Sequence, residues 1–172
     1  MVPKIISSKK ILLAGLSFFG DPFSQASSWD EENEIGRLWN RFYSILERSQ
    51  DTIKYKKDES RFIEIHLYHN NTFDTGEYEI FCGIVVEKLV DIPLEFVIKI
   101  LPITEYAIFT IKGKKITEMD WYKNIFDDWL PQVGYEPRFQ YSFQSYDERF
   151  KGLNDLENSE LDFYFPVKKI QK

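Results

Sequence analysis

The fold of this chain is decided by the stretch Asp128-Trp129-Leu130-Pro131-Gln132-Val133-Gly134-Tyr135-Glu136-Pro137. Pro131 and Gly134 are residues that end helices, and they follow a run of apolar positions at helical spacing that begins near residue 116. Residues 139–143 and 161–167 alternate apolar and polar side chains, which is the pattern of half-buried strands. The last third therefore predicts a helix, a glycine turn and two strands separated by a polar loop at 151–160.

The first half of the chain shows the same order of elements. An apolar run at 10–19 predicts a strand, and a helix is expected to begin near Ser28 or Asp30. Residues 62–67 and 78–86 then predict two further strands. The helix is recognised by an apolar stripe with three- and four-residue spacing. The stripe consists of Ile35, Leu38, Trp39, Phe42, Ile45 and Leu46.

These two halves predict an α+β fold built from tandem pseudo-symmetric strand–helix–strand–strand repeats. The first repeat covers about residues 1–90 and the second about 94–172, with extended segments at 96–101 and 106–111 opening the second. We expect two antiparallel sheets side by side, each backed by a helix, within a single domain over 1–172. The short junction at 91–95 leaves the repeats in contact, and a ligand cleft is expected between them.

Composition excludes several classes of function. The net charge of −6 and the short basic segments argue against direct nucleic-acid binding, which requires clustered Lys and Arg. No apolar run is long enough for a membrane span, and the single cysteine, Cys82, lies in an apolar segment as a buried thiol would. We therefore expect a cytoplasmic protein that contacts neither nucleic acid nor membrane. His66 and His69 are the only histidines and are poorly spaced for a metal, so no metal site and no cofactor are predicted.

Three motifs together resemble one bacterial family. They are the Trp-Leu-Pro helix end with its glycine turn at 129–134, the segment Phe143-Gln144-Ser145-Tyr146-Asp147, and the closing Tyr164-Phe165-Pro166-Val167. The combination is similar to the effector-binding domain of AraC- and MerR-type multidrug regulators, also called the GyrI-like domain. The resemblance spans nearly the whole chain and is strongest from 106 to 167. It implies a ligand-binding, transcription regulator-like protein with a pocket for multidrug compounds.

The resemblance also implies which residues bind the ligand. Transferred onto this sequence, the family's pocket positions fall on Trp39, Tyr78, Tyr106, Gln144 and Tyr164. Trp121 and Tyr146 are expected to be their neighbours. Each position has a simpler interpretation as well: the aromatic residues could be core, and Gln144 could lie on an exposed strand face.

Gln144 occupies a position at which the family usually carries a glutamate that faces cationic ligands. An amide supplies hydrogen bonds but no charge, so this sequence is expected to favour neutral aromatic ligands. That expectation fails if another acid, such as Glu77, Glu87 or Glu105, projects into the same cavity.

The function implied by this resemblance is a stand-alone protein that binds small aromatic, drug-like molecules. Residues 1–11 lead almost directly into a strand, which leaves no room for a DNA-binding module. One alternative is a hydrolase of electrophilic aromatic compounds, which needs an acid that Gln144 cannot supply, unless Asp147 or Glu148 does. Enzymatic activity is therefore not the favoured interpretation. Another alternative is a protein-interaction module of the gyrase-inhibitor type, with a protein partner.

Overall fold

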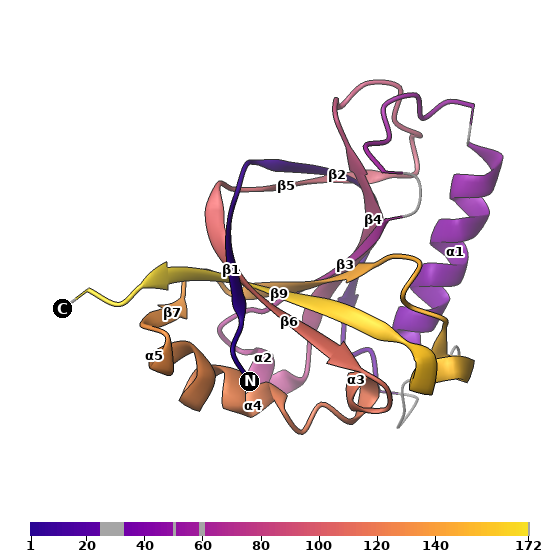
Figure 1. Ribbon diagram of the computed structural model, residues 1–172. Coiled ribbons are helices and arrows are strands. Elements are labelled where there is room, and N and C mark those ends of the chain that lie inside the picture. Colours follow the sequence, from indigo (N-terminus) through magenta and orange to yellow (C-terminus); the bar gives the residue numbers. More distant parts are fainter. Residues whose placement is uncertain (25–32, 50, 59–60, 172) are drawn as a thin grey trace.

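In the computed structural model, residues 1–24, 33–49, 51–58 and 61–171 are described (Figure 1). This part of the chain forms an α+β fold around one antiparallel sheet of nine strands. The strands are β1 (Lys4–Ser8), β2 (Ile11–Gly20), β3 (Phe62–Leu67), β4 (Tyr78–Val86), β5 (Val97–Leu101), β6 (Thr104–Lys112), β7 (Tyr135–Pro137), β8 (Tyr141–Tyr146) and β9 (Glu160–Lys169). Their order across the sheet is β1-β6-β9-β8-β3-β4-β2-β5, and β7 pairs with β9.

The sheet is continuous, which corrects the expectation of two separate sheets. Strands β2, β4 and β3 come from the first half of the chain, and β6, β9 and β8 come from the second. Within its own half, β3 is paired only with β4, and β8 is paired only with β9, so each strand has one edge without a partner in that half. These two edges pair with each other, with Glu64 opposite Gln144, so that backbone groups on both strands are satisfied.

The outer edges of the sheet exchange strands between the halves. Strand β1 precedes β2 in the chain but pairs with β6, and β5 precedes β6 but pairs with β2. The sheet is also strongly curved, as Figure 1 shows. At the crossing of β2 and β4, Gly15 faces Gly83, and a Cβ at Gly15 would lie 2.0 Å from the carbonyl oxygen of Cys82. The close approach of these strands therefore requires glycine.

Helix α1 (Glu34–Arg48) follows the apolar stripe expected from the sequence. It begins at Asn33, whose side chain accepts a hydrogen bond from the backbone N–H of Gly36 at 2.8 Å. The expected start at Ser28 or Asp30 falls outside the described residues, and the cap is Asn33. An amide oxygen at this position satisfies one of the free N–H groups of the first turn.

The second helical segment is broken rather than continuous. It consists of α3 (Lys115–Glu118), α4 (Tyr122–Asn124), the π-helical turn η1 (Ile125–Trp129) and α5 (Leu130–Gln132). Met119 takes a left-handed backbone conformation, with φ of 55°, which interrupts the helix after its first turn. Pro131 does not stop the helix as expected; it lies inside α5, and the chain turns at Gly134. The missing N–H of Pro131 is consistent with the wider π-helical turn that precedes it.

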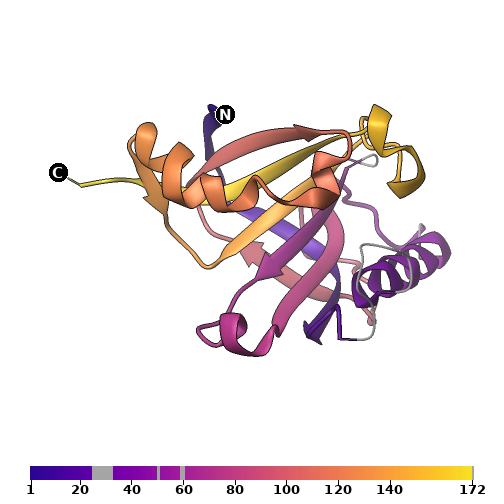
Figure 2. The ribbon, with the colours of Figure 1, turned by 90° about the horizontal axis from the view of Figure 1, so that it is seen from below.

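The two faces of the sheet carry different layers. The outer, convex face is covered by α1 on the first half and by α3 to α5 on the second, as Figures 1 and 2 show. The inner, concave face packs against itself: Leu13, Ile63, Phe143 and Tyr164 belong to one apolar cluster that draws on both halves. None of the helices in the described ranges combines the length and apolar character needed to cross a lipid bilayer.

Two short elements complete the chain. Helix α2 (Thr72–Thr75) lies between β3 and β4. The segment expected to be a polar loop contains the 3-10 turn η2 (Leu153–Asn158). Directly after this turn, the Ser159 hydroxyl donates to the carbonyl oxygen of Asp155 and accepts from the N–H of Lys151. Local hydrogen bonds of this kind give the segment a defined conformation despite its polar composition.

Candidate functional site

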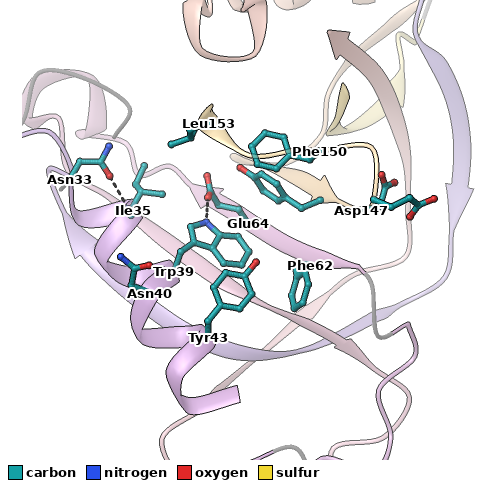
Figure 3. A pocket seen from close by; sticks show the side chains of 13 residues that line it. Asn33, Ile35, Trp39, Asn40, Tyr43, Phe62, Glu64, Asp147, Phe150 and Leu153 are labelled. Carbon is teal, nitrogen blue, oxygen red and sulfur yellow. Dashed lines mark hydrogen bonds between the residues drawn. The ribbon is translucent and has the colours of Figure 1, made fainter. Parts of the chain in front are cut away.

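A cavity of about 430 Å³ lies on the outer face of the sheet, beside α1 (Figure 3). Helix α1 and strand β3 of the first half supply one side of it, and residues 146–153 of the second half supply the other. Five aromatic rings form its walls, and one carboxylate lies on its floor. We call it the aromatic cavity. It is lined by Asn33, Ile35, Gly36, Trp39, Asn40, Tyr43, Phe62, Glu64, Tyr146, Asp147, Glu148, Phe150 and Leu153.

Helical spacing explains how α1 contributes to this wall. Ile35, Trp39 and Tyr43 are each four residues apart, so their side chains follow one another along the same face of the helix. The rings of Trp39 and Tyr43 stack with centroids 5.4 Å apart, and Phe62 and Tyr146 meet the Trp39 ring edge-on. The cavity therefore offers a surface of ring faces and edges, which suits a flat aromatic ligand.

Glu64 is the central polar group of the aromatic cavity. It lies inside strand β3 and only 1% of it is exposed. One carboxylate oxygen accepts a hydrogen bond from the indole N–H of Trp39, drawn as a dashed line in Figure 3. The other lies 2.8 Å from Nε2 of His66. A buried carboxylate is costly unless it is hydrogen-bonded, and these contacts reduce that cost without a formal cation from Lys or Arg.

Alternation along β3 places Glu64 on this face of the sheet. Phe62, Glu64 and His66 point outward, whereas Ile63 and Ile65 point into the inner apolar cluster. The antiparallel register then sets Phe62 opposite Tyr146 and Glu64 opposite Gln144. The joined edges of the two halves thus bring the polar residues together between the helical layers.

Burial and the negative charge of Glu64 raise the pKa of neighbouring titratable groups. Burial raises the pKa of Tyr146 well above its usual range, and the negative charge of Glu64 raises it further. Burial followed by the same charge also raises the pKa of Tyr78 and that of Cys82. These groups stay protonated at neutral pH, so they neither add negative charge nor compete with Glu64 for a cation.

The rim of the aromatic cavity carries further acids. Asp147 and Glu148 line it, and among the described residues no Lys or Arg does. Arg149 donates to Asp147 at 2.7 Å and to Asp162 at 2.6 Å, and its hydrogen bonds hold the pKa of Asp147 below its usual value. The opening of the cavity is therefore negative overall, although Asp147 is already ion-paired.

The residues expected at one ligand site are divided among different places. Trp39 and Tyr146 line the aromatic cavity. Gln144 lies beside it, 7% exposed, where it accepts a hydrogen bond from the Tyr146 hydroxyl at 2.6 Å. It does not lie on an exposed strand face. It shares the outward direction with Tyr146 and Ser142, as the alternation of β8 predicts, but it does not line the cavity.

Tyr106 and Tyr164 lie on the opposite face of the sheet. Both line a second cavity of about 290 Å³ on the concave side, which we call the inner cavity. Trp121 and Tyr78 line neither cavity. Trp121 lies between α3 and α4 and is buried in the core cluster of the second half, where its indole N–H donates to the carbonyl oxygen of Lys115. Tyr78 packs with its ring centroid 5.3 Å from that of His66.

Sequence reasoning missed the carboxylate itself. None of Glu77, Glu87 and Glu105 lines the aromatic cavity, but Glu64 does. Neutral ligands were expected only if no acid reached the cavity, so the argument for neutral ligands does not hold. The signal was present in the strand Phe62-Ile63-Glu64-Ile65-His66-Leu67, in which an acid stands between two isoleucines. Because side chains alternate along a strand, Glu64 shares its face with the aromatic residues Phe62 and His66, and an acid among rings on one strand face is a candidate functional residue. In the described ranges, no group of three or more His, Cys, Asp or Glu residues is arranged to hold a metal ion.

Several known proteins share this fold. Over 167 residues the chain is 28% identical to the transcriptional regulator BrlR of Pseudomonas aeruginosa, covering 97% of this chain and 56% of BrlR. The structure of SAV2435 bound to tetraphenylphosphonium superposes with a TM-score of 0.67 at 15% identity, covering 98% of this chain and 94% of that one. EcmrR, solved in a complex with DNA, superposes with a TM-score of 0.69 at 13% identity, covering 97% of this chain and 57% of EcmrR.

The chain therefore spans little more than half the length of the curated relative BrlR. Residues 4–167 match the Cass2 family, described as integron-associated effector binding proteins, which is nearly the entire sequence. The fold agrees with that match. The protein belongs to the Cass2 family of effector-binding proteins, within the GyrI-like group that also supplies effector-binding domains to bacterial transcription regulators.

Proposed function

We propose that this protein binds lipophilic aromatic cations in the aromatic cavity, with Glu64 as the counter-charge. The observation that carries the proposal is the burial of Glu64 among aromatic rings, with no Lys or Arg of the described residues ion-paired to it. Such a protein would sense or sequester drug-like compounds. The role of Gln144 is to hold the Tyr146 hydroxyl beside the carboxylate rather than to contact the ligand.

The energetics favour a cation over a neutral ligand of the same shape. A positive charge near a buried carboxylate is stabilised more strongly than it would be in water, because the surroundings are poorly polarisable. The rings of Trp39, Tyr43 and Phe62 add cation–π attraction of about 0.5–2 kcal/mol. A neutral ligand gains the apolar contacts alone. The structural relative SAV2435 was solved with the aromatic cation tetraphenylphosphonium, which supports the same ligand class here.

The test compares tetraphenylphosphonium with neutral triphenylphosphine oxide by isothermal titration calorimetry and Trp fluorescence. We expect the cation to bind the native protein at least about tenfold more tightly, on the scale of a charge-assisted contact. Glu64→Gln should abolish this preference while leaving the neutral compound's affinity unchanged. Glu77→Gln, a change at an exposed glutamate outside the cavity, is the matched control and should retain the preference. Equal affinity for both compounds in the native protein would refute the proposal.

A hydrolase of electrophilic aromatic compounds is a second candidate, because Glu64 and Tyr146 line the same cavity. A carboxylate could activate water as a general base, and a neutral phenol could donate a proton to the leaving atom. This hypothesis is tested by incubating the protein with an excess of an aromatic epoxide and measuring the hydrolysis product by chromatography over several turnovers. Turnover that Glu64→Gln and Tyr146→Phe both remove would support it. Tight binding of tetraphenylphosphonium without any turnover would leave binding as the function.

A further inference from the structure

The inner cavity is formed by nearly the whole sheet. Every strand except β7 contributes at least one side chain to it, and its volume is about 290 Å³. It is separated from the aromatic cavity by the sheet itself, since its β3 residue, Ile63, points opposite to Glu64. Concave faces of curved sheets are common places for ligands. Its apolar wall consists of Ile6, Ile11, Leu13, Ile63, Val85, Leu101 and Phe143.

Arg61 is the main polar group of this cavity. Its Nε donates to the hydroxyl of Ser145 at 2.7 Å, and its Nη2 donates to the hydroxyl of Tyr164 at 2.9 Å. These partners are neutral, and in the described ranges no carboxylate forms an ion pair with Arg61. The guanidinium is thus held in place by hydrogen bonds to residues of β8 and β9, and these hydrogen-bond partners carry no charge.

Among the described residues, two further charged side chains, those of Lys57 and Asp58, line the inner cavity. Together with Arg61, they leave a net positive charge on the part of the lining that the structure describes. Arg61 also lies close enough to Asp147 to contribute to its lowered pKa, but the carboxylate of Asp147 is hydrogen-bonded to Arg149. The inner cavity therefore combines an aliphatic interior with a fixed positive group, whereas the aromatic cavity combines rings with a fixed negative group.

We propose that the inner cavity is a second ligand site, which takes an organic monocarboxylate with an apolar body. The aliphatic chain would lie against Leu13, Ile63 and Phe143, and the carboxylate would accept hydrogen bonds from Arg61, with Lys57 adding charge. A planar guanidinium matches the two oxygens of a carboxylate, which favours this head group over an alcohol or an ammonium. The site and its ligand class are independent of what binds in the aromatic cavity.

The test uses octanoate as the probe, with octanol and octyltrimethylammonium as uncharged and cationic controls of equal chain length. Binding is followed by calorimetry and by methyl NMR of the native protein. We expect octanoate alone to bind appreciably and to shift the methyl signals of Leu13 and Ile63, but not those of Ile35 and Leu153, which line the aromatic cavity. Octanoate binding should persist when tetraphenylphosphonium is bound, because the two cavities lie on different faces.

Arg61→Gln should weaken octanoate binding about tenfold or more, since it replaces a charge-assisted contact by a neutral one. Arg138→Gln is the matched control, because Arg138 does not line the inner cavity. The ligand series needs no variant and therefore decides the question even if Arg61→Gln unfolds the protein. Equal binding of all three probes, shifts at Ile35 and Leu153 instead, or no octanoate binding at millimolar concentration would each overturn the proposal.

Discussion

The aromatic cavity and the inner cavity lie on opposite faces of the same strands, and their chemistry is opposite. Strand β3 turns Glu64 outward toward Trp39 and turns Ile63 inward, and Arg61, just before the strand, also lines the inner side. Because side chains alternate along a strand, one short segment can place a buried acid and a positive group on different sides of a sheet. The sheet then screens each site from the other's ligand.

The two cavities also differ in how much of the fold depends on them. The inner face forms a packed cluster from both halves of the chain, so its residues stabilise the protein as well as lining a cavity. The aromatic cavity lies between a helix and a turn, with partly exposed rings such as Tyr43 and Phe150. Substitutions on the inner face are therefore expected to affect stability first, and those in the aromatic cavity to affect binding first.

The largest expected effect comes from removing an inner-face ring. Phe143 is 2% exposed and stacks on Tyr164 with ring centroids 4.4 Å apart. Phe143→Ala should lower the free energy of unfolding by about 3–5 kcal/mol, through lost burial and the cavity left behind. Phe150→Ala, at the aromatic cavity, is the comparison and should cost much less stability while weakening tetraphenylphosphonium binding. Urea unfolding measures the stability of both variants, and equal losses of unfolding free energy would contradict the division between the two faces.

A second acid beside Glu64 on the outer face of the sheet should destabilise the fold almost as much. Gln144→Glu places a carboxylate directly opposite Glu64, and we expect it to destabilise the fold by about 2–3 kcal/mol at pH 8. A glutamate at position 144 adds no new counter-charge for a cation in the proposed site, because Glu64 already supplies one. Burial and repulsion would raise the pKa of the introduced carboxyl in the folded state. Stability should therefore be recovered toward pH 5 and lost as pH rises, which thermal unfolding at both values would show.

Much of the fold could be predicted from periodicity. The strands at 62–67 and 78–86 and the apolar stripe of α1 follow directly from the spacing of apolar residues. The joining of β3 to β8 and the exchange of β1 and β5 could not be predicted, because pairing between distant strands leaves no local pattern. The break at Met119 was missed for a related reason: an apolar helical spacing continues across it although the backbone does not.

The site was predicted less completely than the fold. Trp39 and Tyr146 were identified through the family resemblance, and both line the aromatic cavity. Tyr106 and Tyr164 are pocket positions implied by the same resemblance, yet strand alternation places these two side chains on the other face of the sheet. The resemblance does not point to Glu64, because the family's usual acid falls on Gln144, the partner of Glu64 across the strand pair.

Removing the hydrogen bond from Trp39 to Glu64 should have an intermediate effect. Trp39→Phe keeps a ring in the wall but removes the indole N–H that Glu64 accepts, so we expect a loss of about 1.5–2 kcal/mol in unfolding free energy. The affinity for tetraphenylphosphonium should hold or rise, because the carboxylate then lacks one competing donor. Calorimetry measures the affinity of Trp39→Phe for tetraphenylphosphonium. Tyr43→Phe is measured beside it, because it also keeps a ring in the wall but leaves the hydrogen bond from Trp39 to Glu64 in place. A large loss of affinity in Trp39→Phe alone would mean that the indole ring, rather than the carboxylate, dominates binding.

The smallest effect is expected at Tyr164, and it gives the sharpest comparison of the two faces. Tyr164→Phe removes one neutral acceptor from Arg61 while keeping the ring, so the loss of stability should be about 0.5–1 kcal/mol. Tetraphenylphosphonium affinity should not change, because the ring lies across the sheet from Glu64. Octanoate affinity should stay level or increase, since one donor of Arg61 becomes available to the ligand. If Tyr164→Phe instead weakened tetraphenylphosphonium binding as Glu64→Gln does, the two cavities would be one connected site, and the separation by the sheet would not hold.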